Sequence, residues 1–186
     1  MAQKQNGIER NGVRIECVTG DIAGQSDIDA VVNAANAQLQ VGGGVAGAIH
    51  RAGGPALDAE CRPLAPISPG EAVITGAGNL PNSYVIHCLG PVYGRDTPEE
   101  ELLAACYRNA LKRAEEKRAG SVAFPAISTG AFGYPIRDAA QVAFATIAEA
   151  LSDLTSVTHI RFVLYSLRDR DLHQEVMRDV LGDDDR

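Results

Sequence analysis

A glycine-rich stretch that follows an apolar run is the part of this chain best suited to chemistry. The run Ala30–Ala34 predicts a buried strand, and Gly42-Gly43-Gly44 comes shortly after it, at the start of a predicted helix. Glycines let the backbone approach a ligand, and the free N–H groups at a helix start favour an anion. The stretch fits neither a Walker loop nor the Gly-x-Gly-x-x-Gly dinucleotide fingerprint. It is therefore either a loop for another phosphate ester or a plain turn between a strand and a helix.

A second loop of similar composition follows another apolar run. The run Ser121–Ala126 predicts a strand, and the segment Ser128–Pro135, which contains two glycines, leads from it into the next predicted helix. Ligands of open α/β sheets bind outside the carboxyl ends of the strands. Two such loops on neighbouring strands can therefore close on one pyrophosphate from both sides.

The elements that must position these loops alternate along the chain as in an α/β protein. The predicted strands are Val13–Val18, Ala30–Ala34, Ala72–Thr75, Tyr84–Leu89, Ser121–Ala126 and Ile160–Tyr165. The predicted helices are Gly44–Ala52, Ala56–Cys61, Pro98–Arg118, Ile136–Leu151 and Arg170–Leu181. We expect one domain over residues 1–186, with frayed polar ends at 1–11 and 182–186.

Composition narrows the possible functions. The formal net charge of −7 argues against binding to nucleic acid, since proteins held by phosphate contacts are normally basic. A bound phosphate must then be held by backbone dipoles rather than by lysine.

The chain has no apolar signal segment and no apolar run near the 18 or so residues that span a bilayer, so we expect a soluble cytoplasmic protein.

The four cysteines show neither the close pairing of a zinc site nor the density of a disulfide scaffold. We predict that they are reduced and mostly buried packing residues, and that the protein has no metal and no cofactor. They are Cys17, Cys61, Cys88 and Cys106.

Several motifs together resemble the macrodomains, a family that binds ADP-ribose. The motifs are Gly20-Asp21-Ile22, Asn33-Ala34-Ala35-Asn36, the loop Gly42–Gly47, Tyr84-Val85-Ile86-His87 with Gly90-Pro91, and Phe124–Gly130 with Gly133-Tyr134-Pro135. They occur in the family's order, span nearly the whole chain, and look most like the MacroD-type ADP-ribosyl hydrolases. The resemblance implies a three-layer αβα sandwich around a central mixed, mostly parallel sheet of about six strands.

The resemblance also implies where each part of ADP-ribose binds. Asp21 accepts the adenine amine, the N–H of Ile22 meets a ring nitrogen, and Tyr165 stacks on the adenine face. From the residues alone, Asp21 is equally a helix or turn cap, and an aromatic at a strand end is more often core. Pyrophosphate contacts, mostly from backbone N–H groups, are implied for Gly42, Gly43, Gly44, Val45, Ser128, Thr129, Gly130 and Ala131.

The distal ribose is the reacting end of the ligand. Asn36 is implied to hold its hydroxyls and is the predicted catalytic residue, because an amide both donates to and accepts from vicinal hydroxyls. Ala46, Phe132 and Gly133 are implied to complete this end. We expect a structural role for Asn33, whose side chain holds nearby backbone.

Two histidines are tempting acid–base candidates. His50 lies a turn beyond the glycine loop, and His87 lies inside a predicted strand. We therefore expect packing or supporting roles for both.

The chain departs from the MacroD pattern at Ala46, where those enzymes generally carry an aspartate that orients water. The loop sequence also resembles viral macrodomains of the coronavirus type, which hydrolyse with alanine here. Two functions follow. One is a hydrolase that releases ADP-ribose from acidic protein side chains, or deacetylates O-acetyl-ADP-ribose, by substrate-assisted attack of water. The other is a non-catalytic reader of ADP-ribose or ADP-ribosylated protein. RNA binding, known for some macrodomains, is disfavoured by the acidic composition.

Overall fold

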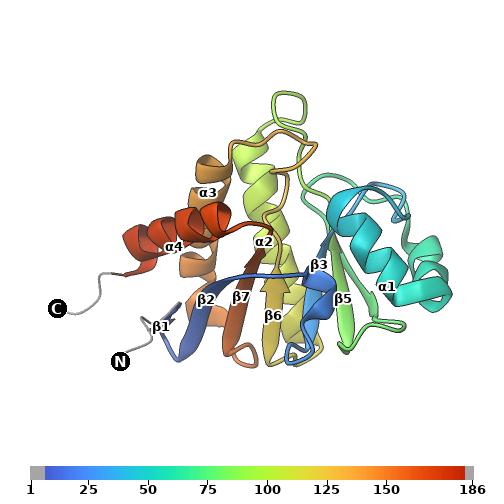
Figure 1. The fold of residues 1–186 in the computed structure, drawn as a ribbon, viewed down its shortest axis with the longest axis horizontal. Helices are drawn as coiled ribbons and strands as arrows, with labels where there is room; N and C mark the ends of the chain where they lie inside the picture. Colours follow the sequence, from blue (N-terminus) through green and yellow to red (C-terminus); the bar gives the residue numbers. More distant parts are fainter. Residues whose placement is uncertain (1–6, 183–186) are drawn as a thin grey trace.

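A computed structural model describes residues 7–182, in which seven strands form one mixed sheet (Figure 1). The strand order is β1-β2-β7-β6-β3-β5-β4, with five parallel strands in the middle and an antiparallel strand at each edge. The strands are β1 (Gly7–Arg10), β2 (Val13–Thr19), β3 (Ala30–Ala34), β4 (Ala72–Gly76), β5 (Tyr84–Cys88), β6 (Ser121–Phe124) and β7 (His159–Leu164). The helices are η1 (Ile22–Gly24), α1 (Gly44–Cys61), η2 (Arg62–Leu64), α2 (Glu99–Glu116), α3 (Ile136–Ala150), η3 (Leu151–Asp153) and α4 (Leu167–Leu181).

The sheet separates two hydrophobic cores, because successive residues of a strand point to opposite faces. In β3, Val32 belongs to the larger core with α2, α3 and α4, whereas Val31 belongs to the smaller core beneath α1 and η1. Figure 1 shows α1 on its own side of the molecule, apart from the other three helices. The predicted three-layer αβα sandwich is confirmed.

The seventh strand corrects the prediction for the N-terminal end. Gly7–Arg10 pairs with β2 through an Asn11-Gly12 turn in which both residues have positive φ. Such a turn is the strongest short hairpin signal, so this stretch is an edge strand rather than a frayed end. At the other end, Gly182 caps α4 by donating its N–H to the carbonyl of Arg178. Residues 1–6 and 183–186 lie outside the described part of the chain.

The predicted helix ends at Pro98, Arg118 and Leu151 are off by one or two residues, and two larger differences have local reasons. The two predicted helices 44–52 and 56–61 are the halves of α1, which is kinked where Gly54 has a φ of 73° before Pro55. Helix α4 begins at Leu167 rather than Arg170, because the Ser166 hydroxyl caps it by accepting from the N–H of Asp169. A serine cap is a common helix start.

All four cysteines are free thiols and buried, as expected for packing residues. Within residues 7–182, no helix combines the length and the apolar character that crossing a membrane requires.

Candidate functional site

The predicted site residues follow the carboxyl ends of four neighbouring parallel strands. Asp21 comes after β2, Tyr165 after β7, Ser128 after β6 and Asn36 after β3, which is also the order of these strands in the sheet. Neighbouring strands lie about 4.8 Å apart, so the four ends span about 14 Å. Strand β3 has β5 on one side and β6 on the other, so the strand order reverses at β3. Open α/β sheets bind ligands at such a switch point.

A cavity of about 320 Å³ lies between the loop after β3 and the loop after β6. The predicted residues that line it are Asn36, Gly42, Gly43, Gly44, Val45, Ala46, Ser128, Gly130, Ala131 and Phe132. The predicted residues outside its lining are Asp21, Ile22, Thr129, Gly133 and Tyr165. The cavity therefore contains most of the residues assigned to the pyrophosphate and the distal ribose.

The first wall of the cavity is the start of α1. Gly43 is the N-cap and has no side chain to cap the helix, so the N–H groups of Gly44, Val45 and Ala46 lack intrahelical acceptors. These donors sit at the positive end of the first half of α1, which runs from Gly44 to the kink at Gly54. The wall can therefore bind an anion without a cationic side chain.

The second wall is the loop after β6, folded into a tight turn. Tyr134 N–H donates to the carbonyl of Ser128 at 2.9 Å, and Gly133 N–H donates to that of Gly130 at 3.0 Å. The Ser128 Oγ is buried, lines the cavity and has no hydrogen-bond partner among the described residues. The Thr129 hydroxyl instead donates to the carbonyl of Ala126 at 2.8 Å. Of the two hydroxyls predicted as ligand donors, only that of Ser128 is unpaired.

A third wall, from the loop after β5, was not among the predicted site residues. Gly90 lines the cavity, and a Cβ there would overlap the Ser128 Oγ. The same loop donates the N–H of Tyr93 to the carbonyl of Phe132 at 2.9 Å, and the ring of Tyr93 packs on that of Tyr134. The signal available in the sequence was the Gly90-Pro91 pair directly after a predicted strand.

Asn36 is held in place by its own loop. Its Nδ2 donates to the carbonyl of Gln40 at 2.8 Å, and its Oδ1 accepts the N–H of Gln40 at 3.0 Å. Each amide atom keeps one further hydrogen-bonding position. The side chain can thus bind vicinal hydroxyls at the rim of the cavity from a fixed orientation.

The residues predicted to bind adenine lie along the same sheet edge. The Asp21 carboxylate caps η1 by accepting the N–H of Ala23 at 2.9 Å, which is the capping role considered for it, and its other oxygen makes no hydrogen bond within residues 7–182. Gly20 N–H donates to the carbonyl of Leu164, which joins the ends of β2 and β7. Tyr165 is 98% exposed, so the alternative that it belongs to the core is wrong.

The cavity lacks an acid or a base. Ala46, at 5% exposure, presents a methyl group in the first turn of α1, and none of the described residues that line the cavity is ionisable. Any chemistry here must use hydrogen-bond donors and positioning rather than a protein general base.

Comparison with known proteins decides the family. Residues 32–143 match the family model described as Macro domain. This chain belongs to the macro domain family. It is similar to a Cronobacter sakazakii protein named O-acetyl-ADP-ribose deacetylase, with 47% identity over 88% of this chain and 93% of that protein.

Solved macrodomain structures resemble this one closely. An Oceanobacillus iheyensis macrodomain with ADP has a TM-score of 0.89 and 39% identity, covering 95% of this chain and 96% of that one. A Trypanosoma brucei macrodomain in complex with ADP-ribose has a TM-score of 0.79 and 33% identity, covering 87% of this chain and 68% of that one.

In this macrodomain, His87 is locked into a buried hydrogen-bond network rather than exposed to the cavity. Its Nδ1 lies 3.1 Å from Asn33 Nδ2, and its Nε2 lies 2.9 Å from the Thr75 Oγ1. Burial, and to a smaller degree His50, lower the pKa of His87 to about 3, so the ring is neutral. The supporting role expected for His87 agrees with this network. The Asn33 side chain was expected to hold nearby backbone, and this is wrong: it contacts the ring of His87 instead.

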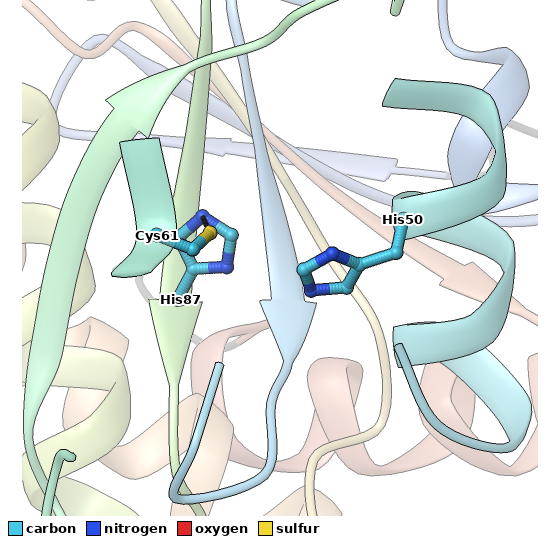
Figure 2. A group of neighbouring side chains, drawn as sticks. All are labelled: His50, Cys61 and His87. Carbon is cyan, nitrogen blue, oxygen red and sulfur yellow. Dashed lines mark hydrogen bonds between the residues drawn. The ribbon is translucent and has the colours of Figure 1, made fainter. Parts of the chain in front are cut away.

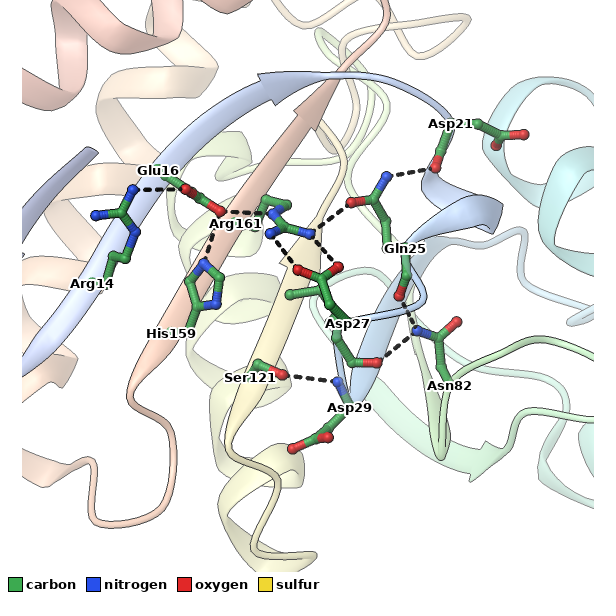
Figure 3. Close-up of polar contacts among 11 residues, drawn as sticks. Arg14, Glu16, Asp21, Gln25, Asp27, Asp29, Asn82, Ser121, His159 and Arg161 are labelled. Carbon is green, nitrogen blue, oxygen red and sulfur yellow. Dashed lines mark hydrogen bonds and ion pairs between the residues drawn. The ribbon is translucent and has the colours of Figure 1, made fainter. Parts of the chain in front are cut away.

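The sheet face beside η1 of the macrodomain carries an ion network centred on Arg161 (Figure 3). Its guanidinium binds both carboxylate oxygens of Asp27 at 2.7 Å and also Glu16 at 2.8 Å. It further donates to Gln25, whose Nε2 donates to the carbonyl of Asp21 at 2.8 Å. The network therefore supports the turn that carries Asp21.

Proposed function

We propose that this macrodomain binds ADP-ribose along the edge formed by β2, β7, β6 and β3. The adenine lies between Asp21, Ile22 and Tyr165, and the pyrophosphate lies between the two glycine-rich loops. The distal ribose lies at Asn36, Ala46, Phe132 and Gly133. The names and ligands of the related proteins support the ligand class. The observation that carries the proposal is the cavity of unpaired N–H groups beside the clamped Asn36.

We further propose that it is a hydrolase. It cleaves the ester between ADP-ribose and an acidic protein side chain, or removes the acetyl group of O-acetyl-ADP-ribose. Because the cavity lining offers no general base, water is oriented by the phosphate of the substrate itself, and Asn36 fixes the ribose hydroxyls. Backbone N–H groups stabilise the charge that develops. A positioned general base typically contributes about 10²- to 10⁴-fold, so this enzyme is slow rather than inactive.

The methyl group of Ala46 favours a second candidate, a reader that binds the same ligand and releases it unchanged. The two candidates share the binding site and differ only in turnover. One experiment separates them: release of free ADP-ribose from a glutamate-linked mono-ADP-ribosylated protein, with ADP-ribose binding measured in parallel by calorimetry.

The variants are chosen from the contacts. Asn36→Ala removes the ribose contact and also the clamp on Gln40, so Asn109→Ala is the matched control. Asn109 likewise donates to a loop carbonyl, that of Gly70 at 2.9 Å, but lies outside the cavity lining. A hydrolase loses at least 100-fold in rate with Asn36→Ala and keeps its rate with Asn109→Ala.

Ala46→Asp tests the missing base. The third position of a helix tolerates an acid, since the helix dipole stabilises it there. For the hydrolase we expect the wild type to turn over slowly and Ala46→Asp to turn over faster. Binding without release in wild type, with turnover gained in Ala46→Asp, establishes the reader. No binding of ADP-ribose by wild type refutes both.

A further inference from the structure

Three buried side chains with metal-ligating atoms converge from two elements. His50 and Cys61 come from the two halves of kinked α1, and His87 comes from β5. Figure 2 shows His50 extending from α1 toward the other two. One ligand atom of each lies within 4.8 Å of the others, and all three residues are buried. The kink at Gly54 lets both halves of one helix face the same strand.

The ring of His50 has an atom that nothing satisfies. Its Nδ1 lies 2.7 Å from the Asp58 Oδ1, so this nitrogen carries a hydrogen and donates it to the carboxylate. Its Nε2 is buried and has no hydrogen-bond partner among the described residues. A buried ring nitrogen without a hydrogen-bond partner is unfavourable, and such a nitrogen can offer its lone pair to a metal ion when no proton is on it. A histidine that binds zinc through one ring nitrogen commonly donates the hydrogen of the other nitrogen to a carboxylate.

The other two residues are already close to ligand spacing. The Cys61 Sγ lies 3.6 Å from the His87 Nε2. Zinc bonds of about 2.3 Å to sulfur and 2.0 Å to nitrogen, at a tetrahedral angle, place these two atoms about 3.5 Å apart. His50 must move inward by about 1 Å for its Nε2 to bind the same ion, and Thr75 must give up its 2.9 Å hydrogen bond to the His87 Nε2.

We propose that His50 Nε2, Cys61 Sγ and His87 Nε2 bind one Zn²⁺ ion. Two imidazoles and a thiolate suit a borderline-soft ion rather than Mg²⁺ or Ca²⁺. The thiolate and the Asp58 carboxylate behind His50 balance the two positive charges, which buried ions need. The Thr75 Oγ1 lies 2.9 Å from the His87 Nε2, and its hydroxyl can supply the fourth ligand once this hydrogen bond is released.

Binding requires the single ring proton of His87 to move from Nε2 to Nδ1. Without the ion, its Nε2–H donates to Thr75, because the Thr75 hydroxyl hydrogen is used toward the carbonyl of Gly76. With the ion, the Nε2 coordinates and the ring proton sits on Nδ1. Asn33 then turns its amide so that its Oδ1, which has no partner now, accepts from Nδ1. The Cys61 thiol also loses its proton to the solvent when it binds.

Such an ion would fasten α1 to β5. The N-terminus of α1 is the anion-binding wall of the cavity, so the ion would hold that wall at a fixed distance from the sheet. This inference does not depend on the identity of the ligand in the cavity.

The first test uses the wild-type protein. After treatment with a chelator and dialysis, it is titrated with Zn²⁺ and, separately, with Co²⁺. We expect one tightly bound ion per chain, a cobalt–thiolate absorption band, and a zinc X-ray absorption spectrum with one sulfur and two nitrogen neighbours. No stoichiometric binding, or a shell of nitrogen and oxygen alone, overturns the proposal.

The second test uses matched cysteines. Cys61→Ser should weaken Zn²⁺ binding at least tenfold and abolish the cobalt–thiolate band. Cys106→Ser is the control, since Cys106 is equally buried but lies in the other core, where it donates to the carbonyl of Leu89. Circular dichroism establishes that both variants fold. Equal Zn²⁺ affinity in the two variants refutes the site. If Cys61→Ser does not fold, the sulfur neighbour in the wild-type X-ray absorption spectrum decides whether Cys61 binds the ion.

Discussion

Ser128 and Thr129 are neighbours with opposite hydrogen-bonding states, and this difference predicts opposite effects of removing each hydroxyl. The Ser128 Oγ is buried at the cavity without a partner, whereas the Thr129 hydroxyl donates to the carbonyl of Ala126. A buried polar group left unpaired costs about 1–3 kcal/mol, and a satisfied hydrogen bond contributes about 1 kcal/mol. Ser128→Ala should therefore stabilise the free protein and Thr129→Val should destabilise it.

The expected shifts are measurable. Ser128 has a φ of 67°, but serine and alanine both carry a Cβ, so the cost of this backbone conformation cancels in Ser128→Ala. A change of about 1 kcal/mol corresponds to about 2–4 °C in Tm for a chain of this size. We expect Ser128→Ala to melt up to that much higher and Thr129→Val that much lower.

Ligand affinity should change in the other direction. A hydrogen bond to a charged phosphate oxygen is worth about 1.5–3 kcal/mol, so Ser128→Ala should weaken ADP-ribose binding roughly 10- to 150-fold. Thr129→Val should bind within about threefold of wild type, because its hydroxyl hydrogen is already used by the backbone. Differential scanning fluorimetry and calorimetry measure both quantities. A Ser128→Ala variant that melts lower and binds ADP-ribose as tightly as wild type would refute the reasoning.

Three further predictions test the surroundings of the cavity. Gly90→Ala places a Cβ against the loop after β6 and should lower the free energy of unfolding in urea by about 1–3 kcal/mol. Gly130 has open space around it, so the control Gly130→Ala should stay within about 0.5 kcal/mol of wild type. Equal stabilities of the two variants would contradict the packing described for Gly90. Hydrogen bonds from Arg161 lower the pKa of Asp27 to about 2. The Tm of Asp27→Asn should therefore lie below that of wild type above about pH 4, and the difference should disappear between pH 4 and pH 2 as the Asp27 carboxylate of wild type is protonated. A constant Tm difference across that range would exclude a stabilising role for the ionised carboxylate. Tyr165→Ala should leave the Tm unchanged, since the ring is exposed. It should weaken ADP-ribose binding roughly 5- to 150-fold through lost stacking, whereas the affinity for inorganic pyrophosphate should not change. An unchanged ADP-ribose affinity would show that Tyr165 is not part of the site.

The parts of the fold that the sequence predicted are those with local signals. Apolar runs located six of the seven strands, and the glycine-rich loops after β3 and β6 were expected on neighbouring strands, which the sheet confirms. The kink in α1 was visible as a break between two predicted helices at Gly54-Pro55. In each case the residues that decide the structure are adjacent in the chain.

The parts that were missed depend on contacts between distant residues. Gly90 enters the cavity only because β5 pairs with β3, and no pattern near Gly90 reveals that pairing. Arg161 binds Asp27 across 134 residues of chain. His50, Cys61 and His87 have none of the spacings typical of metal motifs, because a kinked helix and a sheet, rather than one loop, bring them together.

The anion-binding walls of this macrodomain are made of main-chain amides, and this has a consequence for how the protein can change over evolution. An amide donor is present at every residue except proline, so most side-chain replacements in these loops would keep the donors as long as the backbone keeps its path. A single position such as Ala46 can then vary between acidic and apolar residues while the ligand stays bound. A slow hydrolase and a fast one would thus be separated by one substitution rather than by a rebuilt site.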